Sequence, residues 1–107
     1  MRYNAIRGME IRFATKELED LYVSEKGANR YPTEVVDAFF DLVTLISEAP
    51  DERDLRALKG AHFEKLPGRN TFSMRLNRKW RLEIVFEASK SREKTVVLIR
   101  ISNHYGD

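Results

Sequence analysis

Residues 72–86, FSMRLNRKWRLEIVF, decide the fold of this 107-residue chain. Apolar and polar side chains alternate on both sides of the polar step Asn77–Lys79. A period of two is typical of a strand with one buried face, and a short polar step between two such runs is typical of a turn. The stretch therefore predicts two neighbouring strands that run antiparallel.

The same period continues on both sides of this hairpin. Val97, Ile99 and Ile101 alternate with Leu98, Arg100 and Ser102, which predicts a further strand near the C-terminus. A segment around His62–Leu66 is a candidate for one more strand. Turns are predicted at Pro67–Asn70 and in the polar loop Ser89–Lys94. The second half of the chain thus predicts an antiparallel meander of three or four strands.

The first half of the chain has a different period. After a short alternating run at Glu10–Ala14, Thr15 is a suitable N-cap for a helix that we expect to stop at Gly27. A second helix is predicted from Pro32 to Glu48, because its apolar residues recur at three- and four-residue spacing and Ala49-Pro50 ends it. Asp51–Asp54 is interpreted as a polar connection.

Together these elements predict an α+β fold in which a short N-terminal strand and two helices pack on one face of an antiparallel meander sheet. Met1–Gly8 has no clear period and is interpreted as a flexible lead. Residues 9–107 are expected to form a single domain, since a chain of this length has room for one core. No cysteine is present, and no apolar stretch approaches the ~18 residues that span a bilayer, so we expect a cytoplasmic protein that does not bind membranes.

Charge is divided unevenly along the chain. Leu55–Asp107 contains 12 Lys/Arg against 5 Asp/Glu, a net of +7, whereas Met1–Asp54 contains 7 against 12, a net of −5. A basic half in a small domain indicates an anionic partner, and nucleic acid is the first candidate.

Several of these cations fall on the polar positions of the predicted strands. Arg75 and Arg81 should share the polar face of adjacent strands, and Arg100 and His104 should share one face of the last strand. Lys59 lies just upstream of the meander. Guanidinium groups bind phosphate and stabilise charge that develops on its oxygens, and histidine transfers protons near neutral pH. If these residues converge, they could perform phosphodiester chemistry.

Other residues have simpler interpretations. Without His104, the base would have to be Lys59, Glu83 or Glu87. His62 is interpreted as a surface bystander, and Trp80 as a core anchor rather than a platform for base stacking. The spacing of the two histidines and the scattered carboxylates predicts no metal site, and no cofactor-binding motif is present.

Three segments carry a resemblance to a known family. They are Leu55–Gly60 (LRALKG), Phe72–Leu82 (FSMRLNRKWRL) and the closing run Ile101–His104 (ISNH). In these segments the chain resembles the HigB group of toxins in the RelE/ParE superfamily, the toxic halves of bacterial toxin–antitoxin pairs. With the opening strand Met9–Phe13, the similarity covers most of residues 9–105.

The resemblance implies a RelE-like fold and a ribosome-dependent endonuclease that cleaves mRNA without a metal, by attack of the ribose 2′-hydroxyl. It implies catalytic roles for Lys59, Arg81 and His104. The cations expected to bind RNA phosphate are Arg75, Arg78, Lys79 and Arg100. The partners it implies are the ribosome with its mRNA and a cognate, HigA-like helix-turn-helix antitoxin, with operator DNA contacted only through the toxin–antitoxin complex.

The closing run departs from the family pattern. Similar members end in Asp-Tyr-His, whereas this chain reads Ser102-Asn103-His104, which removes a carboxylate that could orient the site. Two alternatives therefore stand beside the nuclease: a ParE-like toxin of the same fold that inhibits DNA gyrase, and a catalytically weak regulator that binds the antitoxin. The acidic helix Pro32–Glu48 could serve as a partner surface in any of them.

Overall fold

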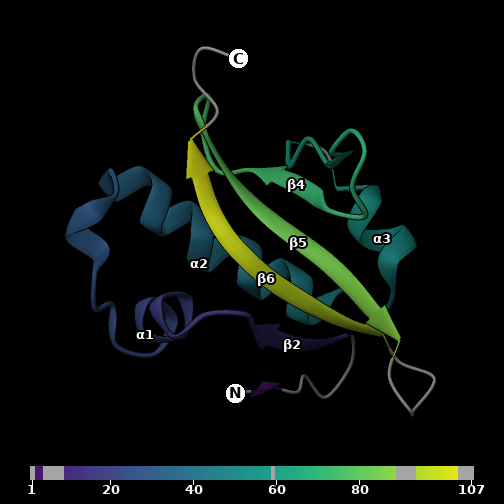
Figure 1. Cartoon of the computed structure of the whole chain (residues 1–107), viewed down its shortest axis with the longest axis horizontal. Helices are drawn as coiled ribbons and strands as arrows, with labels where there is room; N and C mark the ends of the chain where they lie inside the picture. The colour runs from purple at the N-terminus through teal and green to yellow at the C-terminus, as the bar shows by residue number, and fades with distance from the viewer. Residues whose placement is uncertain (1, 4–8, 59, 89–93, 104–107) are drawn as a thin grey trace.

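The computed structural model describes residues 9–58, 60–88 and 94–103, together with the backbone of Arg2 and Tyr3. These residues form a six-stranded sheet in the order β1-β2-β6-β5-β4-β3, with helices packed against it (Figure 1). In chain order the elements are β1 (Arg2–Tyr3), β2 (Glu10–Phe13), α1 (Lys16–Ser24), the 3₁₀ turn η1 (Ala28–Arg30), α2 (Thr33–Glu48), α3 (Glu52–Arg56), β3 (Glu64–Lys65), β4 (Phe72–Arg75), β5 (Trp80–Ala88) and β6 (Lys94–Asn103).

The α+β class and the meander are confirmed, with one correction to the sheet. β3, β4, β5 and β6 pair antiparallel in sequence order, whereas β2 pairs parallel with β6, with Ile11 opposite Val96. A parallel pair needs a long crossover connection, and here the helices and the first three strands of the meander supply it. β1 pairs antiparallel with β2, so part of the segment interpreted as a lead belongs to the sheet edge.

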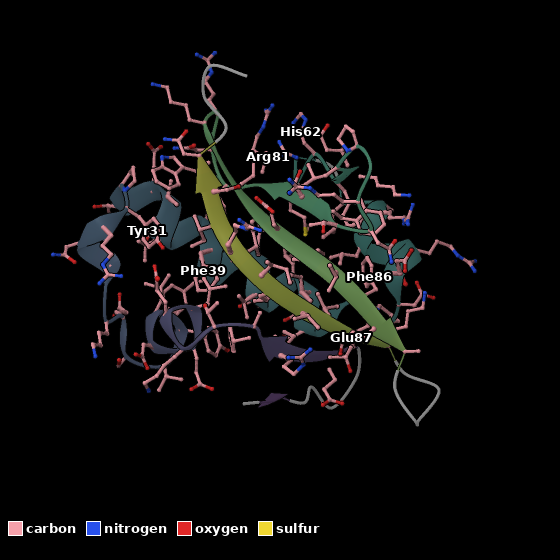
Figure 2. All side chains as sticks on the ribbon, viewed as in Figure 1. Tyr31, Phe39, His62, Arg81, Phe86 and Glu87 are labelled. Carbon is pink, nitrogen blue, oxygen red and sulfur yellow. The ribbon has the colours of Figure 1, made fainter. Side chains whose placement is uncertain are left out.

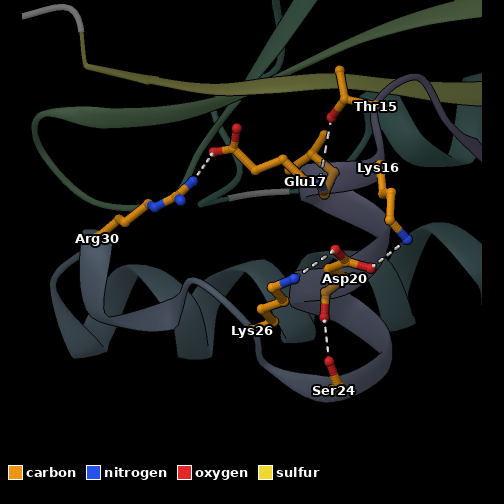
Figure 3. Close-up of polar contacts among 8 residues, drawn as sticks. Thr15, Lys16, Glu17, Asp20, Ser24, Lys26 and Arg30 are labelled. Atoms are coloured by element: carbon orange, nitrogen blue, oxygen red, sulfur yellow. Dashed lines mark hydrogen bonds and ion pairs between the residues drawn. The ribbon is translucent and has the colours of Figure 1, made fainter.

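Helix α1 begins as predicted but ends earlier. The Thr15 side chain caps it by accepting a hydrogen bond from the backbone N–H of Leu18 at 3.2 Å (Figure 3). The helix ends at Ser24, because Glu25 adopts the left-handed conformation with φ 60°. Gly27, predicted to stop α1, instead begins η1 at φ 85°.

Helix α2 matches its predicted bounds closely. Its buried face packs behind the central strands (Figure 1) and consists of Val35, Val36, Phe39, Leu42, Val43 and Ile46. Ala49, with extended ψ of 126°, ends the helix immediately before Pro50.

The segment interpreted as a polar connection forms the short helix α3. The Asp51 side chain accepts a hydrogen bond from the backbone N–H of Asp54 at 3.1 Å, and Leu55 is fully buried. A capping carboxylate followed by one buried apolar residue is sufficient to fold this turn, and the prediction of a plain connection was wrong.

A β-bulge between β5 and β6 changes which side chains of β6 face the core. Leu82 and Ile84 of β5 are fully buried, and Val96 and Leu98 of β6 pack with them in the core. The register shifts between Glu83 and Ile84, after which Leu82 pairs with Ile101. Ile99 is the extra residue, and it moves the alternation by one position. The prediction that Val97, Ile99 and Ile101 share one face is therefore wrong: Ile101 lies on the face of Leu82, whereas Val97, although buried, alternates with the core residues Val96 and Leu98.

Trp80 lies at the beginning of β5 and packs edge-to-face on Tyr31, with ring centroids 5.5 Å apart. Its interpretation as a core anchor is supported, since it packs against the buried cluster. In the part of the chain that the structure describes, no helix is long and apolar enough to cross a membrane.

Candidate functional site: a cationic face on the β4–β5 hairpin

Arg75 and Arg81 lie directly opposite each other on β4 and β5. Their neighbours in the strands, Met74 and Leu82, are fully buried in the core, so the two arginines lie on the opposite face of the sheet. Side chains at directly paired positions have Cβ atoms about 5 Å apart. The prediction that Arg75 and Arg81 share one face is confirmed.

Arg81 is held in place by several acceptors. Its Nε donates to Oγ of Ser73 at 2.7 Å, and its Nη2 donates to the backbone oxygens of His62 at 2.5 Å and of Ser73 at 3.4 Å. Nη2 also lies 3.5 Å from Oε1 of Glu64, and only 13% of the side chain is exposed. These contacts join the segment that contains His62 and Glu64 to the β4–β5 hairpin, and they hold the guanidinium of Arg81 in one position.

The electrostatic environment of Arg81 follows from this burial. Burial lowers the pKa of Arg81, the nearby charge of Arg75 lowers it further, and the carboxylate of Glu64 opposes both. A guanidinium stays protonated in proteins, so Arg81 remains a cation with reduced hydration. Among the described residues, its contacts involve Nε and Nη2.

Arg75 is exposed and touches a histidine. Its Nη1 lies 3.2 Å from Nε2 of His62, while its backbone N–H donates to the carbonyl of Ala61 at 2.6 Å. His62, interpreted from sequence as a bystander, therefore lies within the site, at the same end of the sheet as Arg81 (Figure 2). No short motif indicates this placement, because it depends on the fold of the loop before β3.

The loop reaches this position through left-handed backbone. Gly60 has φ 83° and His62 has φ 47°. Glycine adopts this conformation freely, whereas for histidine it is uncommon. The backbone contacts made by Arg75 and Arg81 hold the strained residue in place.

Arg78 and Lys79 occupy the turn between β4 and β5. Oδ1 of Asn77 accepts hydrogen bonds from the backbone N–H groups of Lys79 and Trp80, both at 2.8 Å. An asparagine that bonds the backbone two and three residues on fixes a tight turn. The side chains of Arg78 and Lys79 are consequently exposed at the tip of the hairpin, beside the end of β6, where Trp80 pairs with Asn103.

Arg100 lies across the sheet from a buried carboxylate. Its Nε is 3.3 Å from Oε1 of Glu83, whose side chain is 4% exposed. Glu83 is therefore poorly placed to act as the base considered from sequence. Glu87, another candidate base, pairs with Arg12 at 2.7 Å and lies at the opposite end of β5 from Arg81 (Figure 2).

Lys59 and His104, two of the predicted catalytic residues, lie outside the described residues. Their chain neighbours Gly60 and Asn103 are described, and Gly60 lines a hollow of about 200 Å³ beside Arg75. That hollow is lined by Ala38, Asp41, Leu42, Leu45, Leu58, Gly60, Ala61 and Arg75. The convergence of Lys59 and His104 with Arg81 remains a prediction.

Larger hollows lie beside α3, and one of them is also lined by Glu64, which contacts Arg81. They measure about 420 and 570 Å³, and both are lined by Glu52, Arg56 and Lys94. Their charges largely pair internally, since Glu52 contacts Arg56 at 2.6 Å and Lys94 at 2.9 Å. The described residues contain no group of three or more His, Asp or Glu placed to hold a metal. The cationic face formed by Arg75 and Arg81 on β4 and β5 is thus the better candidate for chemistry on an anion.

Comparison with known proteins identifies the family of the chain. Residues 11–104 match the family described as HigB-like toxin, a RelE-like toxin of type II toxin–antitoxin systems. The chain is 33% identical over 76 residues to toxin HigB-1 of Vibrio cholerae serotype O1, a match that covers 69% of this chain and 80% of that protein.

Solved structures show the same fold at lower identity. A YoeB/ParE toxin from Agrobacterium tumefaciens matches with a TM-score of 0.60 and 18% identity, over 89% of this chain and 98% of that one. The YoeB–YefM complex from Staphylococcus aureus contains a chain that matches with a TM-score of 0.56 and 19% identity, over 91% and 98%. These two likenesses support the RelE-like fold.

Proposed function

Because the chain belongs to the HigB-like family of RelE-like toxins of type II toxin–antitoxin systems, we propose that it is a ribosome-dependent endoribonuclease that cleaves mRNA and inhibits translation. The observation that carries this proposal is the pair Arg75 and Arg81, which face each other on the sheet beside His62. Two guanidinium groups next to an imidazole form a site suited to a phosphodiester.

The proposed reaction needs no metal. The ribose 2′-oxygen attacks the adjacent phosphorus, and negative charge increases on the phosphate oxygens. Arg81 would stabilise that charge through its fixed guanidinium, since preorganised donors require little rearrangement during the reaction. Arg75 would grip the same phosphate from the facing strand, and Lys59 and His104 would neutralise charge and transfer protons.

The exposed cations around the site would bind the RNA backbone. Arg78 and Lys79 project from the tip of the hairpin, and Arg100 is exposed on β6 despite its contact with Glu83. Contacts between such cations and phosphates add affinity for RNA of any sequence, and they weaken as the salt concentration increases. The ribosome would supply the remaining recognition by presenting one codon at a time.

We also propose the partners expected of such a toxin. A cognate antitoxin of the HigA-like helix-turn-helix type would neutralise the chain in the cytoplasm, and operator DNA would be bound only through that complex. Support comes from the family match and from the solved relative, which is itself a complex of YoeB with YefM.

The test is a map of mRNA 5′ ends after expression of wild-type chain, Arg81→Ala and Arg75→Ala. We expect codon-phased cuts from the wild type, their loss in Arg81→Ala and their weakening in Arg75→Ala. Arg75→Ala is informative because Arg75 is exposed, so its removal should leave the fold intact. Growth arrest with intact mRNA in all three strains would refute the nuclease, and double-strand DNA breaks would then indicate gyrase as the target.

A further inference from the structure

His62 is the one imidazole among the described residues, and both arginines of the site contact it. Nη1 of Arg75 lies 3.2 Å from its Nε2, and Nη2 of Arg81 donates to its backbone oxygen. We propose that His62 is the general base that removes the proton from the attacking 2′-hydroxyl. This inference rests on the proposed nuclease function and adds a catalytic residue to it.

The contact with Arg75 indicates how the ring can be used. A guanidinium has only donors, so a hydrogen bond from Nη1 of Arg75 requires Nε2 of His62 as its acceptor. In that tautomer Nε2 carries a lone pair and Nδ1 holds the ring proton. A neutral imidazole with Nε2 directed into a cationic site is the form that a general base requires.

The backbone of His62 has an uncommon conformation and is held by a hydrogen bond from Arg81. Its φ of 47° is in the left-handed region, and its carbonyl is bound by a guanidinium that is itself mostly buried. Strained residues held by their surroundings concentrate at functional sites. The geometry therefore provides what a catalytic side chain needs, a defined position beside the phosphate-binding cations.

Substrate binding would release the base. Arg75 is exposed, so its guanidinium can move from Nε2 of His62 to a phosphate oxygen, which frees the Nε2 lone pair. In RNA the 2′-hydroxyl and the scissile phosphate are attached to adjacent ribose carbons. A phosphate bound by Arg75 would therefore bring its own 2′-hydroxyl close to Nε2.

In the proposed step, Nε2 of His62 accepts the 2′-hydroxyl proton as the bond from the 2′-oxygen to phosphorus forms. The bond from phosphorus to the 5′-oxygen breaks, and the 5′-oxygen leaves with the electron pair and takes a proton from His104. The products are a 2′,3′-cyclic phosphate and a free 5′-hydroxyl, after which His62 returns its proton to solvent.

The test measures single-turnover cleavage of a short synthetic mRNA on ribosomes. His62→Asn and His62→Ala should each lose at least about 100-fold in rate, because general base catalysis contributes on the order of 10²–10⁴. Asparagine tolerates left-handed backbone and offers an acceptor to Arg75, so it preserves positioning while it removes the proton acceptor. Glu25→Asn is the matched control: Glu25 is exposed at φ 60° at the end of α1, outside the site, so the change should leave the rate unchanged.

A pH profile and a sulfur-substituted substrate separate proton removal from proton donation. The wild-type rate should rise with pH, because a general base acts only in its deprotonated form, and the variants should lose this rise. The charged groups that face His62 and its contacts are Arg75, Arg81 and Glu64. Replacing the leaving 5′-oxygen with sulfur removes the need for an acid, so it should rescue His104→Ala but not His62→Asn.

The outcomes distinguish the inference from the function on which it rests. If the wild type cleaves the mRNA while His62→Asn stays within threefold of it, or if sulfur rescues His62→Asn, the base assignment is wrong and the nuclease assignment stands. If the wild type does not cleave ribosome-bound mRNA, the proposed function fails and the assignment of His62 fails with it.

Discussion

The hydroxyl of Ser73 accepts a hydrogen bond of 2.7 Å from Nε of Arg81, the residue diagonal to it across the β4–β5 hairpin. Ser73 is fully buried, so this hydroxyl has no access to water. The bond orients the guanidinium toward the loop that carries His62. A small buried serine on β4 therefore helps to position the central cation of the site.

The first prediction concerns Ser73→Ala. The change removes the hydrogen-bond acceptor of Nε of Arg81, whose side chain is mostly buried, so we expect a loss of about 1–2 kcal/mol in the free energy of unfolding and a lower rate of mRNA cleavage. Denaturant unfolding and the cleavage assay measure the two effects. Ser24→Ala, which removes a hydroxyl that bonds the Asp20 carbonyl at an exposed position (Figure 3), should change neither. Equal stability of both variants would contradict the prediction.

The second prediction concerns Glu64→Gln. The Glu64 carboxylate lies 3.5 Å from Nη2 of Arg81 and is 62% exposed, so it repels an approaching phosphate while contributing little to stability. We expect the substitution to strengthen binding to ribosome-bound mRNA by about two- to fivefold. This change in affinity corresponds to the interaction energy of a weak exposed ion pair. Glu34→Gln makes the same charge change at an exposed position on α2 and should leave binding unaltered. A loss of affinity in Glu64→Gln would instead indicate that the carboxylate helps to orient Arg81.

The strands and the cation pair were predictable for the same reason. A period of two in residues 72–86 reports directly which side chains share a face, and Arg75 and Arg81 fall on the face opposite Met74 and Leu82. Local capping chemistry likewise predicted the start of α1 at Thr15. These features depend only on nearby residues, and a single sequence contains the relevant pattern.

The remaining features depend on residues far apart in the chain. The parallel pairing of β2 with β6 joins strands from the two ends of the described chain, and alternation within a strand does not specify its neighbours. The bulge inserts Ile99 of β6 opposite the step from Glu83 to Ile84, and a regular period cannot anticipate this extra residue. His62 enters the site through the left-handed loop and two arginine contacts, so residue type alone did not distinguish it from a surface histidine.

The third prediction concerns the salt dependence of RNA binding. If Arg78 and Lys79 each contact one phosphate, the double change Arg78→Ala/Lys79→Ala should weaken binding at low salt and reduce the slope of log affinity against log salt by about 1.4, given about 0.7 for each contact with a single strand. This slope is measured by filter binding to ribosome-bound mRNA at salt concentrations from about 50 to about 200 mM. Lys16→Ala/Lys26→Ala removes two cations that contact Asp20 on α1 and should leave the slope unchanged. Equal slopes for both pairs would place the hairpin tip outside the RNA path.

The last prediction concerns pH and the carboxylate of Glu52. Its hydrogen bond with Lys94 is the main cause that lowers its pKa below 4.5; its bond with Arg56 acts in the same direction, and partial burial opposes them. A carboxyl with a lowered folded-state pKa stabilises the fold fully above its unfolded pKa, and this contribution disappears as pH falls through the folded value. Glu52→Gln should therefore lower the free energy of unfolding by about 1 kcal/mol at pH 7. The difference from wild type should vanish in acid, where the protonated Glu52 of the wild type is as neutral as glutamine. Urea unfolding from neutral pH to below pH 4.5 measures the difference, with Glu48→Gln at the exposed end of α2 as control. A difference that persists in acid would mean that the shape of the side chain, rather than its charge, holds α3 and β6 together.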